Sequence, residues 1–251
     1  MANDPMHQFQ IERFAPFDIN GIDASFSNAS LMMVAGAGLA TLFMTQAMAP
    51  KAMVPGRMQV VAEGAYNFIH SMVRDAAGSE GVKKFFPFVF TLFIFIFMAN
   101  MLGMFPYFFT PTSQIVVTAT LALIVFFTVI IVGVTKNGVK FLKLFAPSGV
   151  PWYILWFVII IEIISFFSRP LSHAVRLWAN VFAGHVLLKV FASFVPMMAA
   201  AGFVGVLGSI LPLGMTVALY ALEFLVAFLQ AYVFALLTCI YLNDALHPGH
   251  H

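Results

Sequence analysis

Hydrophobic positions form long, uninterrupted runs over most of this chain. Residues 85–135 contain no Asp, Glu, Lys or Arg, which is enough apolar sequence for two membrane-spanning helices of about 20 residues each. The prolines of "MFPYFFTPTS" separate these spans, which we predict at 85–108 and 113–135. An earlier apolar run predicts another span at 29–48, ending at the prolines of "APKAMVPGR".

Residues 57–78 are too polar to span a bilayer, and their polar and apolar positions each recur at steps of three and four. That spacing is typical of an amphipathic helix. Such a helix lies flat in the membrane interface or packs against other helices. An ordinary connecting helix packed on a soluble partner is equally compatible with the pattern. The polar positions are Gln59, Glu63, Asn67, His70 and Arg74.

The last two apolar runs, at 151–197 and 203–243, are longer than one perpendicular crossing needs. They predict either two steep spans or one long tilted hairpin, and the pattern alone does not choose between these. Residues 1–27 form a polar N-terminal tail. Since no repeat or linker indicates a second domain, we expect residues 1–251 to form a single all-α polytopic membrane domain.

Composition excludes a soluble globular protein. Apolar residues make up 62% of the chain, charged residues make up 9%, and there are 30 Phe. The only cysteine, Cys239, has no partner within the chain for a disulfide and no ligand-spaced neighbour. We therefore expect no thiolate metal site and no cofactor, and we expect no nucleic-acid partner.

The basic residues are distributed unevenly between the loops of this arrangement. Eight fall on one side of the predicted membrane and only Arg13 falls on the other. The positive-inside rule then predicts an outer N-terminus, and the return of the last two helices predicts a cytoplasmic C-terminus. The eight are Lys51, Arg57, Arg74, Lys83, Lys84, Lys136, Lys140 and Lys143.

A polar stripe runs through the first of the two long apolar runs, around "SRPLSHAVRLWANVFAGH" at 168–185. At about 100° per residue, its members share one side of a helix for more than five turns. A charge at the bilayer centre costs between about 2.5 and 17 kcal/mol, and Arg does not escape this cost by losing its proton. A partner or a water-filled cavity must therefore compensate the cost of placing these charged side chains in the membrane. Its members are Glu162, Ser165, Arg169, Ser172, Arg176 and Asn180, with His173 at its edge.

The charged members of the stripe differ in what they predict. Arg169 lies close to the cytoplasmic end of the helix, so we expect it to snorkel or to pair with Glu162. Arg176 has no acid within reach on its own helix except Glu162, almost four turns away, so we interpret it as functional. Ser172 and Asn180 are equally compatible with backbone bonding and helix packing.

A second polar feature joins the two long runs. His185 comes nine positions after Arg176 and therefore points to the opposite side of the same helix, while Glu223 and Gln230 share a face of the last helix. An imidazole and a carboxylate are the side chains best suited to pass a proton near neutral pH. The pair indicates a proton path with polar stations, although a purely structural His–Glu contact remains open.

These segments resemble subunit a of the F-type ATP synthases. The resemblance is carried by "SRPLSHAVRLWANVFAGH" and "LEFLVAFLQAYVFALLTCIYLNDAL", and by "FMANMLGMFP", in which Asn100 begins an Asn-x-x-Gly-x-x-Pro signature. It runs from about residue 28 to the C-terminus. It implies that Arg176 is the essential stator arginine, that Gln230 is the family's amide on the last helix, and that Asn100 belongs to the proton path. Some bacterial members exchange the residues found here as His185 and Glu223, so this chain resembles the mitochondrial and alphaproteobacterial branch.

The resemblance also implies an architecture and partners. The two long helices would lie tilted against a ring of c subunits, with peripheral-stalk b subunits and the rest of the complex as further partners. The chain would not be an enzyme on its own. It would supply two aqueous half-channels in a bacterial inner membrane, with a periplasmic N-terminus and a cytoplasmic C-terminus. On this basis the proton path comprises His185, Glu223, Gln230, Asn180, Glu162, Ser172, His173 and Asn100.

Two other classes of membrane protein remain as alternatives. A secondary transporter also buries Arg, His and Glu near the bilayer midplane, but it usually contains internal repeats, and none is visible here. A membrane scaffold without transport activity explains the glycines of "GFVGVLGSILPLG" as packing positions. It does not explain why Arg176 lies within an apolar run.

Overall fold

The computed structural model describes residues 9–15, 18–19, 22–23, 25–48, 56–105, 108–138, 141, 144–145 and 151–246. Several positions used in the sequence analysis lie outside the described residues, namely Pro50, Lys51, Pro55, Pro106, Lys140 and Lys143. Everything below concerns the described part of the chain.

Five helical segments are long and apolar enough to cross a membrane. They are α1 (Asn28–Met48), α2 (Arg57–Gly103), α3 (Ile115–Asn137), α4 (Trp152–Ala199), and the segment formed by α5 (Phe203–Gly208) and α6 (Ile210–Leu246). This finding confirms the predicted class, an all-α polytopic membrane protein. It follows from uninterrupted apolar sequence, because only a helix satisfies its own backbone hydrogen bonds in lipid without closing into a barrel.

The chain forms two compact units, and four of the helices contribute residues to both. The first unit comprises residues 1–41, 95–114 and 177–231, and the second comprises residues 42–94, 115–176 and 232–251.

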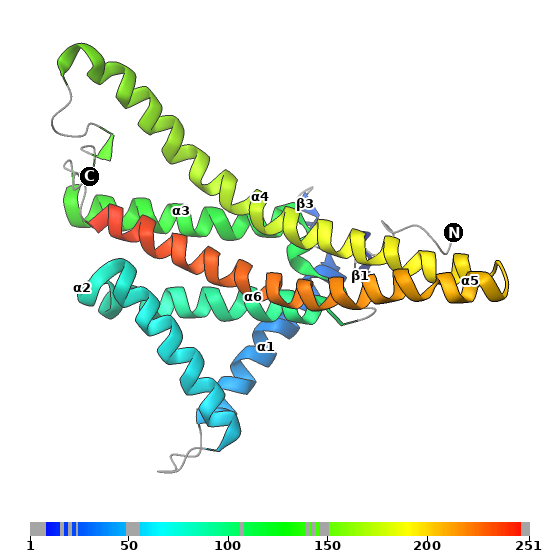
Figure 1. Cartoon of the computed structure of the whole chain (residues 1–251). Helices are drawn as coiled ribbons and strands as arrows, with labels where there is room; N and C mark the ends of the chain where they lie inside the picture. Colours follow the sequence, from blue (N-terminus) through cyan, green and yellow to red (C-terminus); the bar gives the residue numbers. More distant parts are fainter. Residues whose placement is uncertain are drawn as a thin grey trace. The chain divides into compact units, whose positions relative to one another are not determined.

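In the first unit, short strands precede α1. Strand β1 (Arg13–Ala15) pairs antiparallel with β4 (Phe26–Ser27), and β2 (Asp18–Ile19) pairs with β3 (Ile22–Asp23). A 3-10 turn, η2 (Pro111–Ser113), follows the end of α2. The second half of α4 and the first half of α6 run side by side, joined through α5, as the yellow and orange ribbons of Figure 1 show. This hairpin carries His185 and Glu223.

In the second unit, α2 contains a sharp break. Gly78 has φ 68° and ψ −177°, which lies outside the helical region, and the helix changes direction at this point (Figure 1). A side chain at this φ would be strained, so the conformation favours glycine. The polar sequence predicted as an amphipathic helix at 57–78 therefore ends at the break, and helix continues beyond it into the apolar run.

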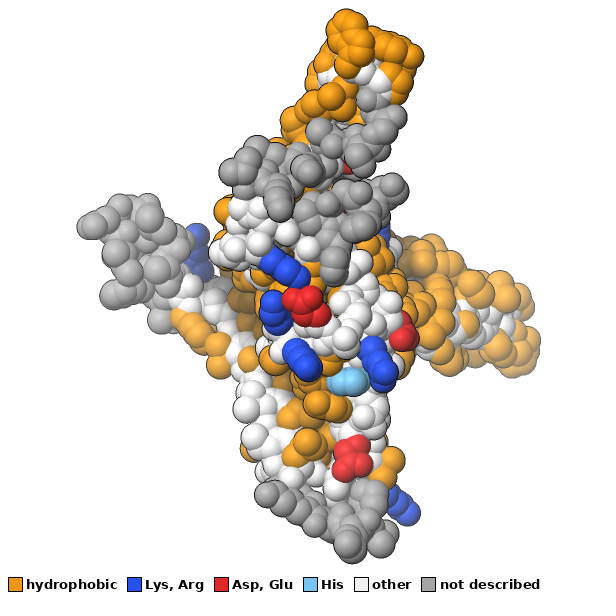
Figure 2. Space-filling model, turned by 90° about the vertical axis from the view of Figure 1, so that its left-hand side faces the viewer, with side chains coloured by type: hydrophobic (Ala, Val, Ile, Leu, Met, Phe, Trp, Pro, Cys, Tyr) orange, Lys and Arg blue, Asp and Glu red, His pale blue; other side chains and the backbone are white. Residues whose placement is uncertain are grey.

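A charged cluster lies just after this break. Glu80 accepts a hydrogen bond from Lys84 Nζ at 3.1 Å and another from Lys136 Nζ, at the end of α3, at 2.8 Å. Figure 2 shows acidic and basic side chains gathered on this face of the molecule. The polar segment before one apolar run and the end of the next are thus joined by ion pairs.

Helix α4 is the least covered of the long helices. Large apolar side chains stand exposed along its first half, including Trp152 at 86%, Trp156 at 64% and Phe167 at 62% exposure. An apolar surface of this extent is a site for lipid or for another protein. The polar stripe predicted from the sequence lies on this thinly covered helix.

Candidate functional site

His185 of α4 and Glu223 of α6 face each other within the first unit. The distance from His185 Nε2 to Glu223 Oε1 is 3.6 Å. Glu223 is only 8% exposed, and neither of its carboxylate oxygens has a hydrogen-bond partner among the described residues. A buried, unsatisfied carboxylate is costly, so this group is suited to exchange a proton with the imidazole next to it.

The close approach of Glu223 depends on a glycine. A Cβ atom at position 184 would lie 2.9 Å from Glu223 Oε1 and 3.2 Å from its Cδ. Both distances are shorter than ordinary van der Waals contact, so any larger residue at Gly184 would displace the carboxyl group. The sequence placed this glycine next to His185 but gave no sign of what it faces.

Thr110 is a second partner of His185 that the sequence analysis missed. Its Oγ1 lies 3.1 Å from His185 Nε2, the same nitrogen that faces Glu223. A hydroxyl group both donates and accepts hydrogen bonds. Thr110 therefore stays bonded to the imidazole whether Nε2 carries a proton or not, which allows His185 to change its protonation state without losing this partner.

A cavity of about 800 Å³ in the first unit opens beside this pair, and we call it the large cavity. It exceeds by far the roughly 10–15 Å³ that one water molecule needs, and polar groups line part of its wall. Among them is Tyr220, also missed by the sequence analysis, whose hydroxyl donates to the carbonyl oxygen of Met104. Tyr220 lies three positions before Glu223, so the two share a face of α6. The polar and charged lining residues are Gln10, Glu12, Asn28, His185, Lys189, Thr216 and Tyr220.

Asn100 is almost completely buried and uses both ends of its amide. Its Nδ2 donates to the carbonyl oxygen of Ala227 at 3.3 Å, and its Oδ1 accepts from the hydroxyl of Thr112 at 2.7 Å. These bonds join α2 to η2 and to α6, one turn beyond Glu223. Asn100 therefore holds the turn of α6 that follows the carboxylate of Glu223.

Arg176 belongs to the second unit and is exposed on α4. Within the described residues its guanidinium takes part in no ion pair and no hydrogen bond. Ser172 and Asn180, one turn before and after it, are also exposed, and Glu162 is partly exposed. Gln230 of the first unit is partly buried and makes no hydrogen bond to the described residues. The charge of Arg176 is therefore not compensated by the described part of this chain.

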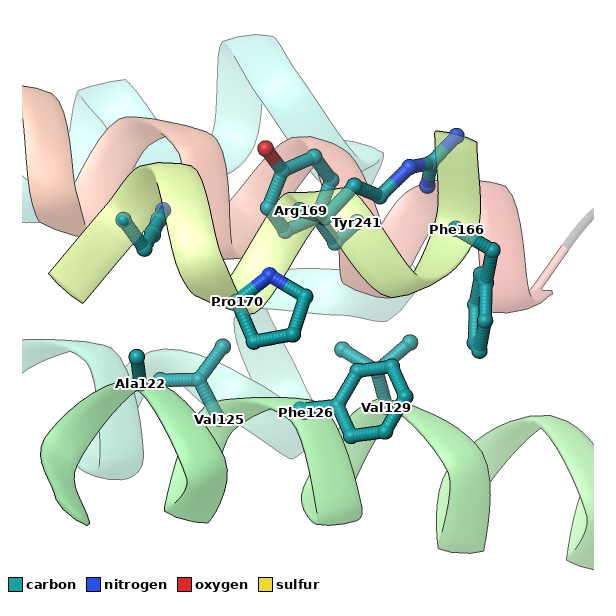
Figure 3. Close-up of a pocket in the computed structure, with 9 residues that line it drawn as sticks. Ala122, Val125, Phe126, Val129, Phe166, Arg169, Pro170 and Tyr241 are labelled. Carbon is teal, nitrogen blue, oxygen red and sulfur yellow. The ribbon is translucent and has the colours of Figure 1, made fainter. Parts of the chain in front are cut away.

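Arg169 pairs with a residue that the sequence analysis did not consider. Its Nη1 lies 3.1 Å from Asp244 Oδ2, and its guanidinium carbon lies 4.9 Å from the centre of the Tyr241 ring. Figure 3 shows the Arg169 side chain extending beside Tyr241. We expected Arg169 to snorkel or to pair with Glu162. It pairs instead with Asp244, because the end of α6 supplies both a carboxylate and an aromatic face.

His173 is buried, with 3% exposure, and does not share the exposed face of Arg176. Its ring packs against Phe234 at 4.4 Å and Tyr241 at 5.3 Å, and its Nε2 atom has no hydrogen-bond partner among the described residues. A cavity of about 10 Å³, large enough for about one water, lies next to it (Figure 3). Pro170 of α4 and apolar residues of α3 also line this cavity.

Comparison with known proteins gives a consistent result. The family model described as ATP synthase A chain matches residues 29–243. The chain is 61% identical to the ATP synthase subunit a of Rhizobium rhizogenes, 60% identical to that of Rhizobium leguminosarum bv. trifolii and 59% identical to that of a Chelativorans species. Each of these matches covers the whole of both chains.

Proposed function

Because this chain belongs to the ATP synthase A chain family, we propose that it forms two aqueous half-channels and carries the arginine that couples proton flow to rotation. The resemblance found in the sequence is confirmed by the family match and by the full-length relatives. The chain is the multi-pass stator subunit of the membrane sector of the ATP synthase complex, and it is not a catalytic enzyme on its own.

The His185–Glu223 pair is the main observation that supports the proposed outer half-channel. His185 lines the large cavity, and Glu223 lies 3.6 Å from it, with no hydrogen-bond partner for either carboxylate oxygen among the described residues. A proton from cavity water binds His185 or Glu223, and the same group then releases a proton toward the partner ring. Thr110 keeps the imidazole oriented through both states.

The proposed partner is a ring of c subunits, each with one carboxylate. Such a group can face lipid only when protonated, because an ionised acid at the bilayer centre costs about 2.5 kcal/mol or more. A ring carboxylate that meets the exposed face of α4 would encounter the fixed charge of Arg176. That charge favours the ionised form, so the proton leaves into the inner half-channel.

Arg176 would also keep the two half-channels separate. A proton crossing directly from one to the other would have to pass a permanent positive charge, which repels it. Rotation of the ring is then the remaining route. Each proton that crosses brings about 2.3 kcal/mol per 100 mV of membrane potential, and this work drives the ring.

The same proposal includes the orientation of the chain in the membrane and its contact with the peripheral stalk. Lys84 and Lys136 both bind Glu80, which supports placing the polar segment before the second span and the end of α3 on one side of the membrane. That side is the cytoplasm by the positive-inside rule, which leaves the N-terminus in the periplasm of a bacterial inner membrane. The b subunits of the peripheral stalk would hold the chain against rotation.

Replacing the carboxyl group of the pair tests this function. Glu223→Gln keeps the shape of the side chain but removes the titrating group, so we expect proton flux through the membrane sector to fall about a hundredfold. The content of the complex, measured by immunoblot of the same vesicles, should stay near wild type. Normal flux in an assembled Glu223→Gln complex would contradict the proposed half-channel.

A further inference from the structure

The N-terminal segment at residues 9–14 lies along one wall of the large cavity and is held by its main chain. Gln114 Nε2 donates to the carbonyl oxygen of Phe9 at 2.9 Å. Asn28 binds the segment twice, since its Nδ2 donates to the carbonyl of Gln10 at 3.1 Å and its backbone N–H donates to the carbonyl of Glu12 at 3.1 Å. Three anchors within four residues fix the position of this segment.

The side chains of this segment alternate between the cavity and its other side. Gln10, Glu12 and Phe14 line the cavity, whereas Ile11 and Arg13 are not part of its lining. Successive side chains of a strand point in opposite directions. Strand β1 begins at Arg13, and the lining residues from Gln10 to Phe14 follow the same alternation. The carboxylate of Glu12 is therefore directed into the cavity by the backbone that the three anchors hold.

The segment also reaches the His185–Glu223 pair. The ring of Phe9 packs on Phe182 of α4 at 4.7 Å, and its edge approaches the His185 ring at 6.5 Å between centres. Phe9, which packs near His185, and Glu12, which lines the cavity, thus belong to one short stretch of chain. Glu12 and His185 share a single water-accessible space.

Charge decides which lining residue can collect a proton from the outer compartment. Among the described residues that line the cavity, Glu12 has the only carboxylate, and Lys189 contributes a positive charge. The positive charge of Lys189 repels incoming protons, and the negative charge of Glu12 offsets this effect. Glu12 is also exposed, so bulk water reaches it.

We infer that Glu12 is a proton-collecting carboxylate that supplies the His185–Glu223 pair through the large cavity. The inference rests on the proposed outer half-channel. The Glu12 carboxylate takes a proton from hydronium, leaving water, and passes it through cavity water to the pair, which returns Glu12 to its ionised form. Glu12 therefore acts ahead of the pair and matters most when protons are scarce.

ATP synthesis in inverted membrane vesicles tests this role, because their lumen corresponds to the outer compartment and its pH is set at preparation. At equal membrane potential, Glu12→Gln should synthesise ATP about tenfold more slowly than wild type when the lumen is alkaline. A charged cleft raises the rate at which an ion arrives by about tenfold or more, and the variant loses this enhancement. The difference should disappear when the lumen is acidic. Glu12→Asp should restore most of the rate, because it keeps the carboxylate on the same backbone.

The matched control is Arg13→Gln, which changes the neighbouring charge on the side that does not line the cavity. It should synthesise ATP at the wild-type rate at both lumenal pH values. Equal rates for Glu12→Gln and wild type at alkaline lumenal pH would overturn the inference, and so would an equal loss in Glu12→Gln and Arg13→Gln at every pH. Glu223→Gln in the same series separates the two proposals. If Glu223→Gln loses synthesis while Glu12→Gln does not, only the role of Glu12 is contradicted. If Glu223→Gln synthesises ATP normally, both proposals are contradicted.

Discussion

Gly184 on α4 lies directly against the carboxyl group of Glu223 on α6, so that a Cβ at position 184 would be 2.9 Å from Glu223 Oε1. Gly184→Ala should therefore push the carboxyl group away from His185. Proton flux should fall by as much as about a hundredfold if the group moves by about 1 Å. Passive proton conduction by vesicles stripped of the catalytic sector measures this directly.

Gly38→Ala is the control for this substitution, because a Cβ at Gly38 meets no atom within 4 Å. It adds the same methyl group to another helix and should leave proton conduction unchanged. Wild-type conduction in an assembled Gly184→Ala complex would show that the distance between His185 and Glu223 is not critical.

The His185–Glu223 pair should tolerate an exchange of its members better than the loss of either. His185→Glu combined with Glu223→His keeps one imidazole and one carboxyl group at the same place, so ATP-driven proton pumping should recover in part. Each single substitution places two like groups together and should pump less. Quenching of a pH-sensitive dye in inverted vesicles gives the comparison, and a double variant no better than the single variants would disprove functional pairing.

The contact of Arg169 with Asp244 should contribute mainly to stability. Both side chains are largely buried, so Arg169→Ala leaves a carboxylate without its partner, at a cost of about 1–3 kcal/mol. The purified complex should lose the subunit at a lower temperature than wild type, while proton pumping below that temperature is largely kept. Asp244→Asn should have a similar effect. A loss of pumping without a loss of thermal stability would instead assign Arg169 a role in proton transfer.

The long helices could be predicted from the sequence, but their contacts could not. Apolar runs and polar stripes are properties of neighbouring residues, so hydropathy identified the membrane class and the exposed polar face that carries Ser172 and Arg176. Thr110 reaches His185 from a distant segment, and nothing in its own surroundings in the sequence indicates this. Tyr220 could have been found from its spacing, three positions before Glu223 on the same helix. The contact of Arg169 with Asp244 could not be predicted either, because only neighbours on its own helix could be weighed.

The break at Gly78 is a second feature that spacing along the sequence could not predict. The spacing of polar and apolar positions predicted an amphipathic helix at 57–78, which ends at this residue. Periodicity does not report a backbone angle, so it did not show that helix resumes immediately after one residue with φ 68°. The contact of Glu80 with Lys136, at the end of α3, joins segments far apart in the sequence, so periodicity could not show it either.

The orientation of the chain can be tested by labelling single cysteines in a Cys239→Ala background. Ile11→Cys should react with a membrane-impermeant maleimide from the outer side, and Lys83→Cys should react only from the cytoplasmic side. Both positions are exposed, so access depends on the side of the membrane and not on burial. Labelling of Lys83→Cys in intact cells would contradict the proposed topology.

The central claim is that the charge of Arg176 drives deprotonation of the ring and separates the half-channels, and proton pumping by an Arg176→Ala complex tests it most directly. ATP-driven pumping is measured in inverted vesicles, with subunit content determined in parallel. Arg176→Lys is included because an ammonium is a compact point charge that loses its proton more readily than the planar guanidinium does. We predict normal assembly with no pumping and no ATP synthesis in Arg176→Ala, and little recovery in Arg176→Lys. Normal pumping by an assembled Arg176→Ala complex would contradict the account.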